Sequence, residues 1–330
     1  MDNNLLGSVA SRLLAPSKGL LAADESTGTI TKRFEGVGLA STPELNRKYR
    51  QMLFSSPGIE EFLSGVIMFD ETVRQKTDEG VSFPEYLSGR GIIPGIKVDE
   101  GREPFGEKEE VAKGLEGLSS RLPEYKSLGL SFTKWRAPIA IKEAYPSEEM
   151  ISENARRMAE FASISQAEGL VPIVEPEVLI DGNHTTTRCA EITVQVLKAL
   201  FAELKEKGVD IAGTILKTNM VLPGRASGVK ALPLEVANAT LRALKASLPS
   251  ELPGVVFLSG GQSPEEATQN LNEINKLKGD APWELSFSFA RALQEEPLEL
   301  WRGKDENVEA AQEAFVKRAR SVSLARQGKL

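Results

Sequence analysis

Lys217 has the clearest chemical potential in this 330-residue sequence. It closes the apolar run Ile211-Ala-Gly-Thr-Ile-Leu-Lys217, which predicts a buried strand that delivers one cation to its end. A desolvated lysine beside a second cation loses its proton more readily, and the neutral amine can attack a carbonyl group to form a Schiff base. The sequence therefore suggests carbonyl chemistry, provided that other elements place partner groups beside Lys217.

The elements that must position these partners are short, continuous apolar runs, which are typical of parallel strands buried on both faces. Eight such runs occupy residues 19–24, 65–70, 92–97, 130–136, 170–177, 211–217, 254–261 and 284–291. Their ends are separated by roughly 27 to 46 residues, enough for a helix and two loops. Helical patterns fill residues 147–167 and 185–204, and Ser263-Pro264 starts another helix. This alternation predicts an α/β fold, a (β/α)₈ TIM barrel that forms a single domain over residues 1–330.

In such a barrel the catalytic groups gather where the strands end, at the carboxyl-terminal mouth. Seven of the eight predicted strands end in suitable side chains: Asp24, Lys97, Lys134, Arg136, Glu175, Lys217, Ser259 and Arg291. Any one of these residues could merely start a solvated loop. Their recurrence at seven strand ends instead predicts a common site.

The roles follow from residue type. The ammonium of Lys134 would favour the neutral form of Lys217 by repulsion. Glu175 would protonate a departing hydroxyl group and later accept a substrate proton. Asp24 would either orient Lys217 or handle a hydroxyl proton, and we count Glu177 among the substrate-binding candidates.

Two groups of residues could hold phosphate. Residues Ser259, Gly260 and Gly261 lead into a capped helix, so their backbone N–H groups can form an anion-binding nest, with Arg291 as a countercharge. Lys97 and Arg136, with Ser26 and Arg33 near the end of the first strand, could hold a second phosphate. Two phosphate-binding sites around a Schiff-base lysine predict the reversible cleavage of a carbon–carbon bond in a small bisphosphorylated ketose.

The composition of the chain argues against several classes of function. The net charge of −7 gives no basic footprint for nucleic acid, and no apolar stretch approaches a membrane span. The first residues lack the features of a signal peptide and Cys189 is the only cysteine, so we expect a cytoplasmic protein without a disulfide. His184 is the only histidine, which argues against a zinc site and a Ser-His-Asp triad. Nucleotide-binding glycine motifs are missing, and we expect no cofactor and no metal.

The motifs closely resemble those of class I fructose-bisphosphate aldolase over about residues 13–328. They include Leu21-Ala-Ala-Asp-Glu-Ser-Thr-Gly28, Gly95-Ile-Lys-Val-Asp99, Lys134-Trp-Arg136, Val171-Pro-Ile-Val-Glu-Pro-Glu177 and Phe257-Leu-Ser-Gly-Gly-Gln-Ser263. The resemblance implies a lyase of glycolysis and gluconeogenesis that interconverts fructose 1,6-bisphosphate with dihydroxyacetone phosphate and glyceraldehyde 3-phosphate, commonly as a homotetramer. It implies the following roles: Schiff-base lysine, Lys217; main acid/base, Glu175; supporting catalytic groups, Lys134 and Asp24; one phosphate site, Ser259, Gly260, Ser288 and Arg291; the other end of the substrate, Ser26, Thr29, Arg33, Lys97 and Arg136.

Three departures from the family pattern bear on rate and substrate preference. Thr218 stands where proline is expected, which predicts a looser exit from the sixth strand, and Ala290 replaces a glycine beside Arg291. The sequence ends at Leu330, whereas many members continue into a tail whose terminal tyrosine assists proton exchange. The alternatives are a Schiff-base aldolase that prefers sedoheptulose bisphosphate or fructose 1-phosphate, and a non-catalytic scaffold barrel.

Overall fold

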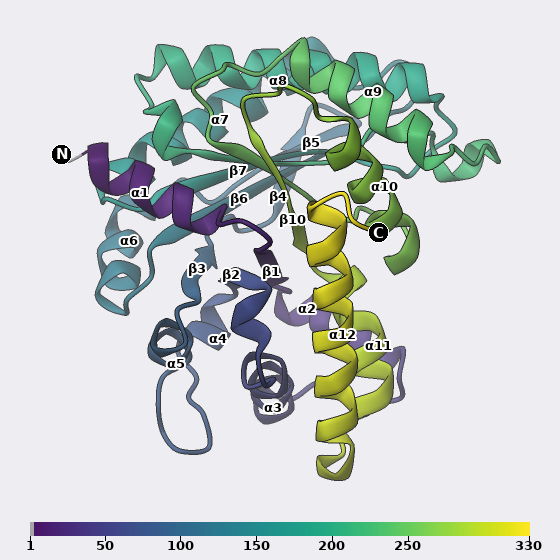
Figure 1. Cartoon of the computed structure of the whole chain (residues 1–330). Helices are drawn as coiled ribbons and strands as arrows, with labels where there is room; N and C mark the ends of the chain where they lie inside the picture. The colour runs from purple at the N-terminus through teal and green to yellow at the C-terminus, as the bar shows by residue number, and fades with distance from the viewer. Residues whose placement is uncertain (1–2) are drawn as a thin grey trace.

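Eight parallel strands close into a barrel in the computed structural model, which describes residues 3–330 (Figure 1). The barrel strands are β1 (Gly19–Ala23), β2 (Leu63–Met68), β3 (Ile93–Lys97), β6 (Phe132–Ile139), β7 (Val171–Val178), β8 (Ile215–Thr218), β9 (Gly254–Phe257) and β10 (Glu284–Phe289). They follow the order β1-β10-β9-β8-β7-β6-β3-β2 around the closed sheet. Almost every strand residue is buried, as the continuous apolar runs predicted. The predicted (β/α)₈ class is confirmed.

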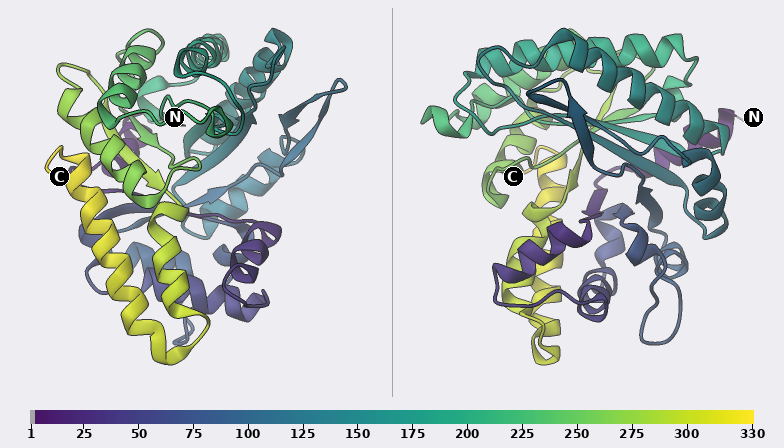
Figure 2. Two further views of the ribbon diagram at one scale, coloured as in Figure 1. Left: turned by 90° about the vertical axis from the view of Figure 1, so that its right-hand side faces the viewer. Right: turned by 180° about the vertical axis from the view of Figure 1, so that it is seen from behind.

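Helices surround the barrel and connect its strands (Figures 1 and 2). They are α1 (Asn3–Leu13), α2 (Thr27–Glu35), α3 (Pro43–Phe54), α4 (Asp70–Val73), α5 (Phe83–Gly89), α6 (Leu118–Ser127), α7 (Glu148–Ala167), α8 (Thr186–Glu206), α9 (Pro233–Lys245), α10 (Pro264–Leu277), α11 (Arg291–Trp301) and α12 (Val308–Arg326). Local chemistry starts them where expected: Ser147 caps α7, Thr185 caps α8, and Ser263 forms a capping box with Glu266 on α10.

Two hydrophobic layers hold the barrel together. The larger layer lies between the strands and the surrounding helices. The smaller one fills the barrel interior, where Ile67, Phe132 and Ile215 pack against Leu6 and Leu13 of α1. Because α1 packs against these inward-facing side chains, the opposite, carboxyl-terminal mouth is the one left for polar groups.

The structure corrects the predicted sixth strand and adds a hairpin. Residues Ile211–Gly213 form a 3₁₀ turn, because the Asp210 carboxylate accepts a hydrogen bond from the N–H of Ala212 at 3.0 Å. The strand itself covers only Ile215–Thr218. Between β3 and α6, the antiparallel strands β4 (Arg102–Phe105) and β5 (Glu109–Ala112) were not predicted, since their charged and half-exposed residues lack an apolar run.

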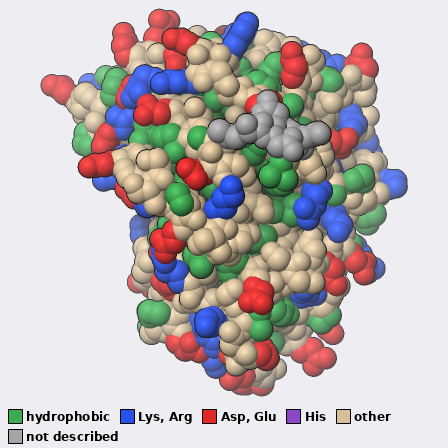
Figure 3. Space-filling view, turned by 90° about the vertical axis from the view of Figure 1, so that its left-hand side faces the viewer, with side chains coloured by type: hydrophobic (Ala, Val, Ile, Leu, Met, Phe, Trp, Pro, Cys, Tyr) green, Lys and Arg blue, Asp and Glu red, His purple; other side chains and the backbone are tan. Residues whose placement is uncertain are grey.

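The surface has no field of one sign on the face shown in Figure 3, where basic and acidic side chains are interspersed and apolar ones form small groups. Among residues 3–330, no helix combines the length and apolarity needed to cross a membrane. Since the net charge is −7, attraction of an anionic ligand must come from a local cluster of cations.

Candidate active site

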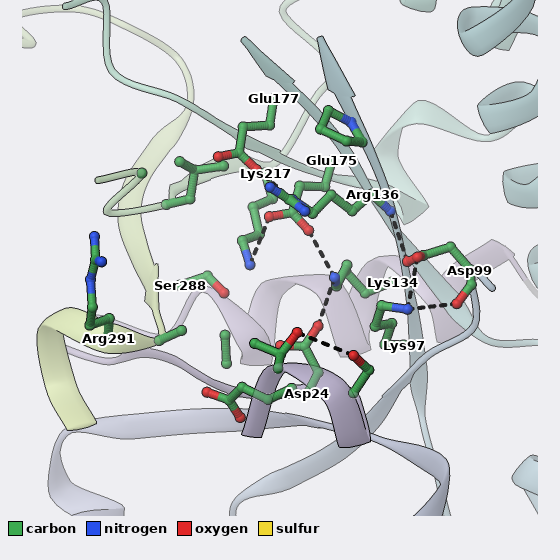
Figure 4. Close-up of a pocket in the computed structure, with 18 of the residues that line it drawn as sticks. Asp24, Lys97, Asp99, Lys134, Arg136, Glu175, Glu177, Lys217, Ser288 and Arg291 are labelled. Carbon is green, nitrogen blue, oxygen red and sulfur yellow. Dashed lines mark hydrogen bonds and ion pairs between the residues drawn. The ribbon is translucent and has the colours of Figure 1, made fainter. Parts of the chain in front are cut away.

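A row of four charged side chains crosses the barrel mouth, each on or directly after a different strand (Figure 4). Lys217 Nζ of β8 lies 3.0 Å from Glu175 Oε1 of β7. The other carboxylate oxygen of Glu175 lies 3.0 Å from Lys134 Nζ of β6, which lies 2.7 Å from Asp24 Oδ2 after β1. The row thus alternates cation and anion, and its formal charges cancel.

All four side chains are largely removed from water. Lys134 and Glu175 are 2% exposed and Lys217 is 4% exposed. Burial by itself would raise the pKa of Asp24 and Glu175, but the ammonium groups of Lys134 and Lys217 outweigh it, so both carboxyl pKa values are lowered. Burial likewise opposes the charge of Lys134, but Asp24 and Glu175 outweigh it and raise its pKa. Lys134 is therefore a fixed cation and Asp24 a fixed anion.

The partners in this row differ in part from the sequence prediction. Glu175 contacts both lysines, so its carboxylate lies between the ammonium groups of Lys134 and Lys217. Asp24 pairs with Lys134, and the contact that orients Lys217 comes from Glu175. A carboxylate in contact with an amine can accept its proton directly.

Lys97, Asp99, Arg136 and Glu177 form a second polar group, in which Lys97 and Asp99 lie beyond Lys134 and Glu177 lies near Glu175 (Figure 4). Lys97 Nζ contacts Asp99 Oδ1 at 2.8 Å, and the other oxygen of Asp99 accepts a hydrogen bond from the backbone N–H of Arg136 at 3.1 Å. The guanidinium of Arg136 contacts Glu177 at 2.5 Å. Glu177 therefore orients a cation. Asp99 was missed as a site residue, although its place two residues after Lys97 is the signal that could have found it.

The loop after β9 has the features of an anion-binding nest. Gly260 and Gly261 adopt φ values of +33° and +78°, which side-chain-bearing residues rarely adopt. Within the described chain, no acceptor is bonded to the backbone N–H groups of Ser259, Gly260 and Gly261. The buried hydroxyl of Ser288 likewise has no partner among residues 3–330. Arg291 starts α11 and lies across the cavity from Lys97 and Asp99 (Figure 4).

These groups line one cavity of about 640 Å³ at the mouth. Every predicted site residue lies on its wall: Asp24, Ser26, Thr29, Arg33, Lys97, Lys134, Arg136, Glu175, Glu177, Lys217, Ser259, Gly260, Gly261, Ser288 and Arg291. Glu25, Asp99 and Arg102 also line it and were not predicted. His184 is buried in the loop before α8, away from the cavity, where burial lowers its pKa. No group of three or more potential metal-ligating side chains occurs in residues 3–330.

The two substitutions in the family pattern have defined surroundings. Thr218 is the last residue of β8, and its hydroxyl donates a hydrogen bond to the carbonyl of Pro176 at 3.2 Å. Its own carbonyl accepts from the N–H of Leu258 at 3.0 Å. These two hydrogen bonds tie Thr218 to the neighbouring segments, and the looser exit from this strand stays a prediction. Ala290 has a negative φ of −102° and adds a methyl group to the cavity wall beside Arg291.

The barrel carries a lysine–carboxylate pair at its mouth, with cations on either side and anion-binding N–H groups on one side. This arrangement is that of lyases that act on phosphorylated carbonyl compounds. The family model described as fructose-bisphosphate aldolase class-I matches residues 5–330. The chain belongs to the class I fructose-bisphosphate aldolase family.

Individual relatives agree with this assignment. A probable fructose-bisphosphate aldolase class 1 from Xanthomonas campestris is 47% identical over 100% of this chain and 99% of its own length. Human fructose-bisphosphate aldolase C is 48% identical over 98% of this chain and 90% of its own length. A crystal structure of the Plasmodium falciparum aldolase, in complex with TRAP and an inhibitor, superposes with a TM-score of 0.97 at 46% identity, covering 99% of this chain and 95% of that one.

Proposed function

We propose that Lys217 forms the covalent bond to substrate in the reaction of the family, the reversible cleavage of fructose 1,6-bisphosphate to dihydroxyacetone phosphate and glyceraldehyde 3-phosphate. The single observation that carries this role is the 3.0 Å contact between Lys217 Nζ and Glu175 Oε1 in a buried site. Transfer of one proton from Nζ to Oε1 produces a neutral amine and a carboxylic acid without changing the net charge of the row.

The amine then attacks the ketone carbon, and the acid form of Glu175 protonates the hydroxyl of the resulting carbinolamine, which leaves as water. The product is an iminium on Lys217 and a regenerated carboxylate on Glu175. A base removes the proton from the C4 hydroxyl, the C3–C4 bond breaks, and its electrons move into the iminium to give an enamine and the aldehyde. Glu175 is the nearer base to Lys217, and Asp24 is the alternative. Protonation of the enamine and hydrolysis release dihydroxyacetone phosphate.

Supporting roles follow from the contacts. Lys134 keeps Asp24 and Glu175 ionised in the resting site, since it contacts both. The nest at Ser259–Gly261, with Ser288 and Arg291, holds one phosphate. The opposite side of the cavity holds the other through Ser26, Thr29, Arg33, Lys97 and Arg136, and Glu177 orients Arg136. Arg291 and Lys97 lie on opposite sides of the cavity (Figure 4), an arrangement that supports a substrate with a phosphate at each end.

Borohydride trapping tests the role of Lys217. The protein is mixed with dihydroxyacetone phosphate in EDTA, reduced, and digested for peptide mass spectrometry. A reduced adduct on Lys217 is the expected result. A folded protein that binds the ligand without forming an adduct would exclude this mechanism and favour the scaffold role. Values of kcat/KM for fructose 1,6-bisphosphate, sedoheptulose bisphosphate and fructose 1-phosphate then decide the substrate preference.

We extend the proposal to the whole chain. Residues 1–330 form one domain, and the protein works in the cytoplasm as a homo-oligomer, a tetramer by family resemblance. An Arabidopsis relative named as cytosolic, 49% identical over 95% of this chain, supports the location.

A further inference from the structure

A largely buried ion network reaches one wall of the cavity through Glu25 and Arg33 and is not part of the catalytic row. Glu25 follows Asp24 directly, and its Oε1 contacts Arg33 Nη1, while its Oε2 lies 2.6 Å from Arg50 Nη2. The Arg33 side chain is 22% exposed and lines the cavity, whereas the side chains of Arg50 and Glu25 are only 2% and 4% exposed. One carboxylate therefore holds one cation that reaches the cavity and one that is enclosed by protein.

Packing fixes the enclosed part of this network. Gln294 of α11 donates to Glu25 Oε1 at 3.1 Å and to the carbonyl of Ala22 at 2.7 Å, and its own oxygen accepts from Arg50 at 3.4 Å. Nearby, three aromatic rings pack together from the helices involved: Phe34 of α2, Tyr49 of α3 and Trp301 of α11. Glu25 and Arg50 are thus held in place from three sides.

Arg33 is held only at one point. Within residues 3–330, Glu25 is its sole hydrogen-bonding or ion-pair partner. A phosphate that binds Arg33 must compete for it with this carboxylate. If Arg33 were the only cation beside Glu25, its transfer to the ligand would leave a buried carboxylate unpaired, which is strongly unfavourable.

We propose that Arg50 is a positioning residue that makes Arg33 available to a substrate phosphate. Arg50 remains paired with Glu25 when Arg33 turns to the ligand, so the buried carboxylate always keeps a counterion. The three side chains together carry a net charge of +1, and the excess cation is the one at the cavity wall. This role rests on the proposed function, in which Arg33 contacts a phosphate group of the substrate.

The first test compares Arg50→Met, Arg50→Lys and the control Arg47→Met. Arg47 lies on the same helix, but its side chain, 15% exposed, pairs with the exposed carboxylates of Glu44 and Asp78. Calorimetry gives the Kd of inorganic phosphate, and steady-state kinetics give kcat and KM for fructose 1,6-bisphosphate. We expect Arg50→Met to raise both the Kd of phosphate and the KM of fructose 1,6-bisphosphate by about tenfold or more, with kcat little changed. Arg50→Lys should retain most of the affinity, and Arg47→Met should match the parent protein.

A second substitution separates this role from simple packing. Glu25→Gln in the Arg50→Met background removes the carboxylate that would retain Arg33, so phosphate affinity should recover. A double variant that binds as weakly as Arg50→Met would show that Arg50 acts through packing alone and would overturn the proposal. In the double variant the group that loses its ion-pair partner is Arg33, which is 22% exposed at the cavity, so this variant offers a second protein to measure if Arg50→Met is unstable.

Trapping with unphosphorylated dihydroxyacetone distinguishes failure of this inference from failure of the proposed function. This ketone reports on Lys217 without any phosphate contact. Adduct formation in the parent protein, together with unchanged phosphate affinity in Arg50→Met, would refute the role of Arg50 while leaving the Schiff-base mechanism intact. Absence of an adduct in the parent protein would instead remove the basis of both.

Discussion

Replacement of Lys134 by methionine tests whether the alternating charges at the mouth determine both stability and catalysis. The substitution keeps an unbranched side chain but removes the cation that contacts Asp24 at 2.7 Å and Glu175 at 3.0 Å. Glu175 then keeps its contact with Lys217, whereas Asp24 loses its only ion-pair partner among residues 3–330. Breaking a buried ion pair by removing one partner costs about 3–5 kcal/mol, and we expect a loss of unfolding free energy in that range at pH 8.

The pH dependence follows from the direction of each pKa shift. Lowered carboxyl pKa values mean that Asp24 and Glu175 contribute stability above their ordinary values of 3.8 and 4.5, and that this contribution disappears as the pH falls through the lowered ones. The raised pKa of Lys134 means that its contribution is complete below its ordinary value of 10.5 and is lost only as the pH rises through the raised value. In the parent protein the three charged groups therefore make their full contribution to the free energy of unfolding between about pH 5 and pH 9.

In the Lys134→Met variant the pKa values of both carboxyl groups rise, and one group takes up a proton as the pH falls. The destabilisation should therefore be smaller at pH 5 than at pH 8, as measured by urea unfolding at both pH values. We also expect kcat/KM to fall by about 10²–10⁴-fold, because the acid–base group is no longer held in its ionised form.

A matched control is Lys245→Met, in which a half-exposed lysine loses a 3.7 Å contact with Asp280. Its effect should stay within about 0.5 kcal/mol at either pH. A loss below about 1 kcal/mol for Lys134→Met at pH 8, or an equal loss at both pH values, would refute the reasoning.

Three further predictions concern other groups at the mouth. Lys217→Arg keeps a cation beside Glu175, so the protein should fold, but it should give no borohydride adduct and lose at least about 10³-fold in kcat. Ser288→Ala removes a buried hydroxyl without a partner in residues 3–330, so thermal unfolding should show equal or higher stability while KM rises; a clear destabilisation would contradict this assignment. Gly261→Ala places a Cβ 2.4 Å from the Arg225 guanidinium at a φ of +78°, so the loop should distort, with about 1–3 kcal/mol of destabilisation in urea and weaker binding of inorganic phosphate. Unchanged phosphate affinity would show that this loop is not the phosphate site.

Much of the fold could be predicted because its signals are local. A strand buried on both faces is mostly apolar, and the barrel strands are, apart from polar residues such as those that β6, β7, β8 and β10 carry. The serine and threonine caps before α7, α8 and α10 bond to N–H groups only three residues away. The β4–β5 hairpin escaped prediction because its half-exposed strands have no such apolar run.

The membership of the site could also be predicted, since a closed parallel barrel brings every strand end to one mouth whatever the sequence distance. Which of these side chains form ion pairs with each other could not be predicted. Side-chain contacts depend on the register between strands and on the reach of each side chain, and these decide that Glu175 contacts both lysines and that Asp24 pairs with Lys134. Asp99 lies two residues after Lys97, but its contact with the N–H of Arg136, 37 residues away, exists only in the folded barrel.

The sequence by itself determined the barrel class, the family and the set of polar groups at the mouth, because strand periodicity, helix caps and motif spacing are properties of neighbouring residues. Only the tertiary structure decided which charge neutralises which. The buried Glu25, shared between a cation at the cavity and the enclosed Arg50, has no sequence signal, since α2, α3 and α11 meet only in the folded chain. Electrostatic energies inside a protein depend on distance and burial, and both are set when these elements pack together.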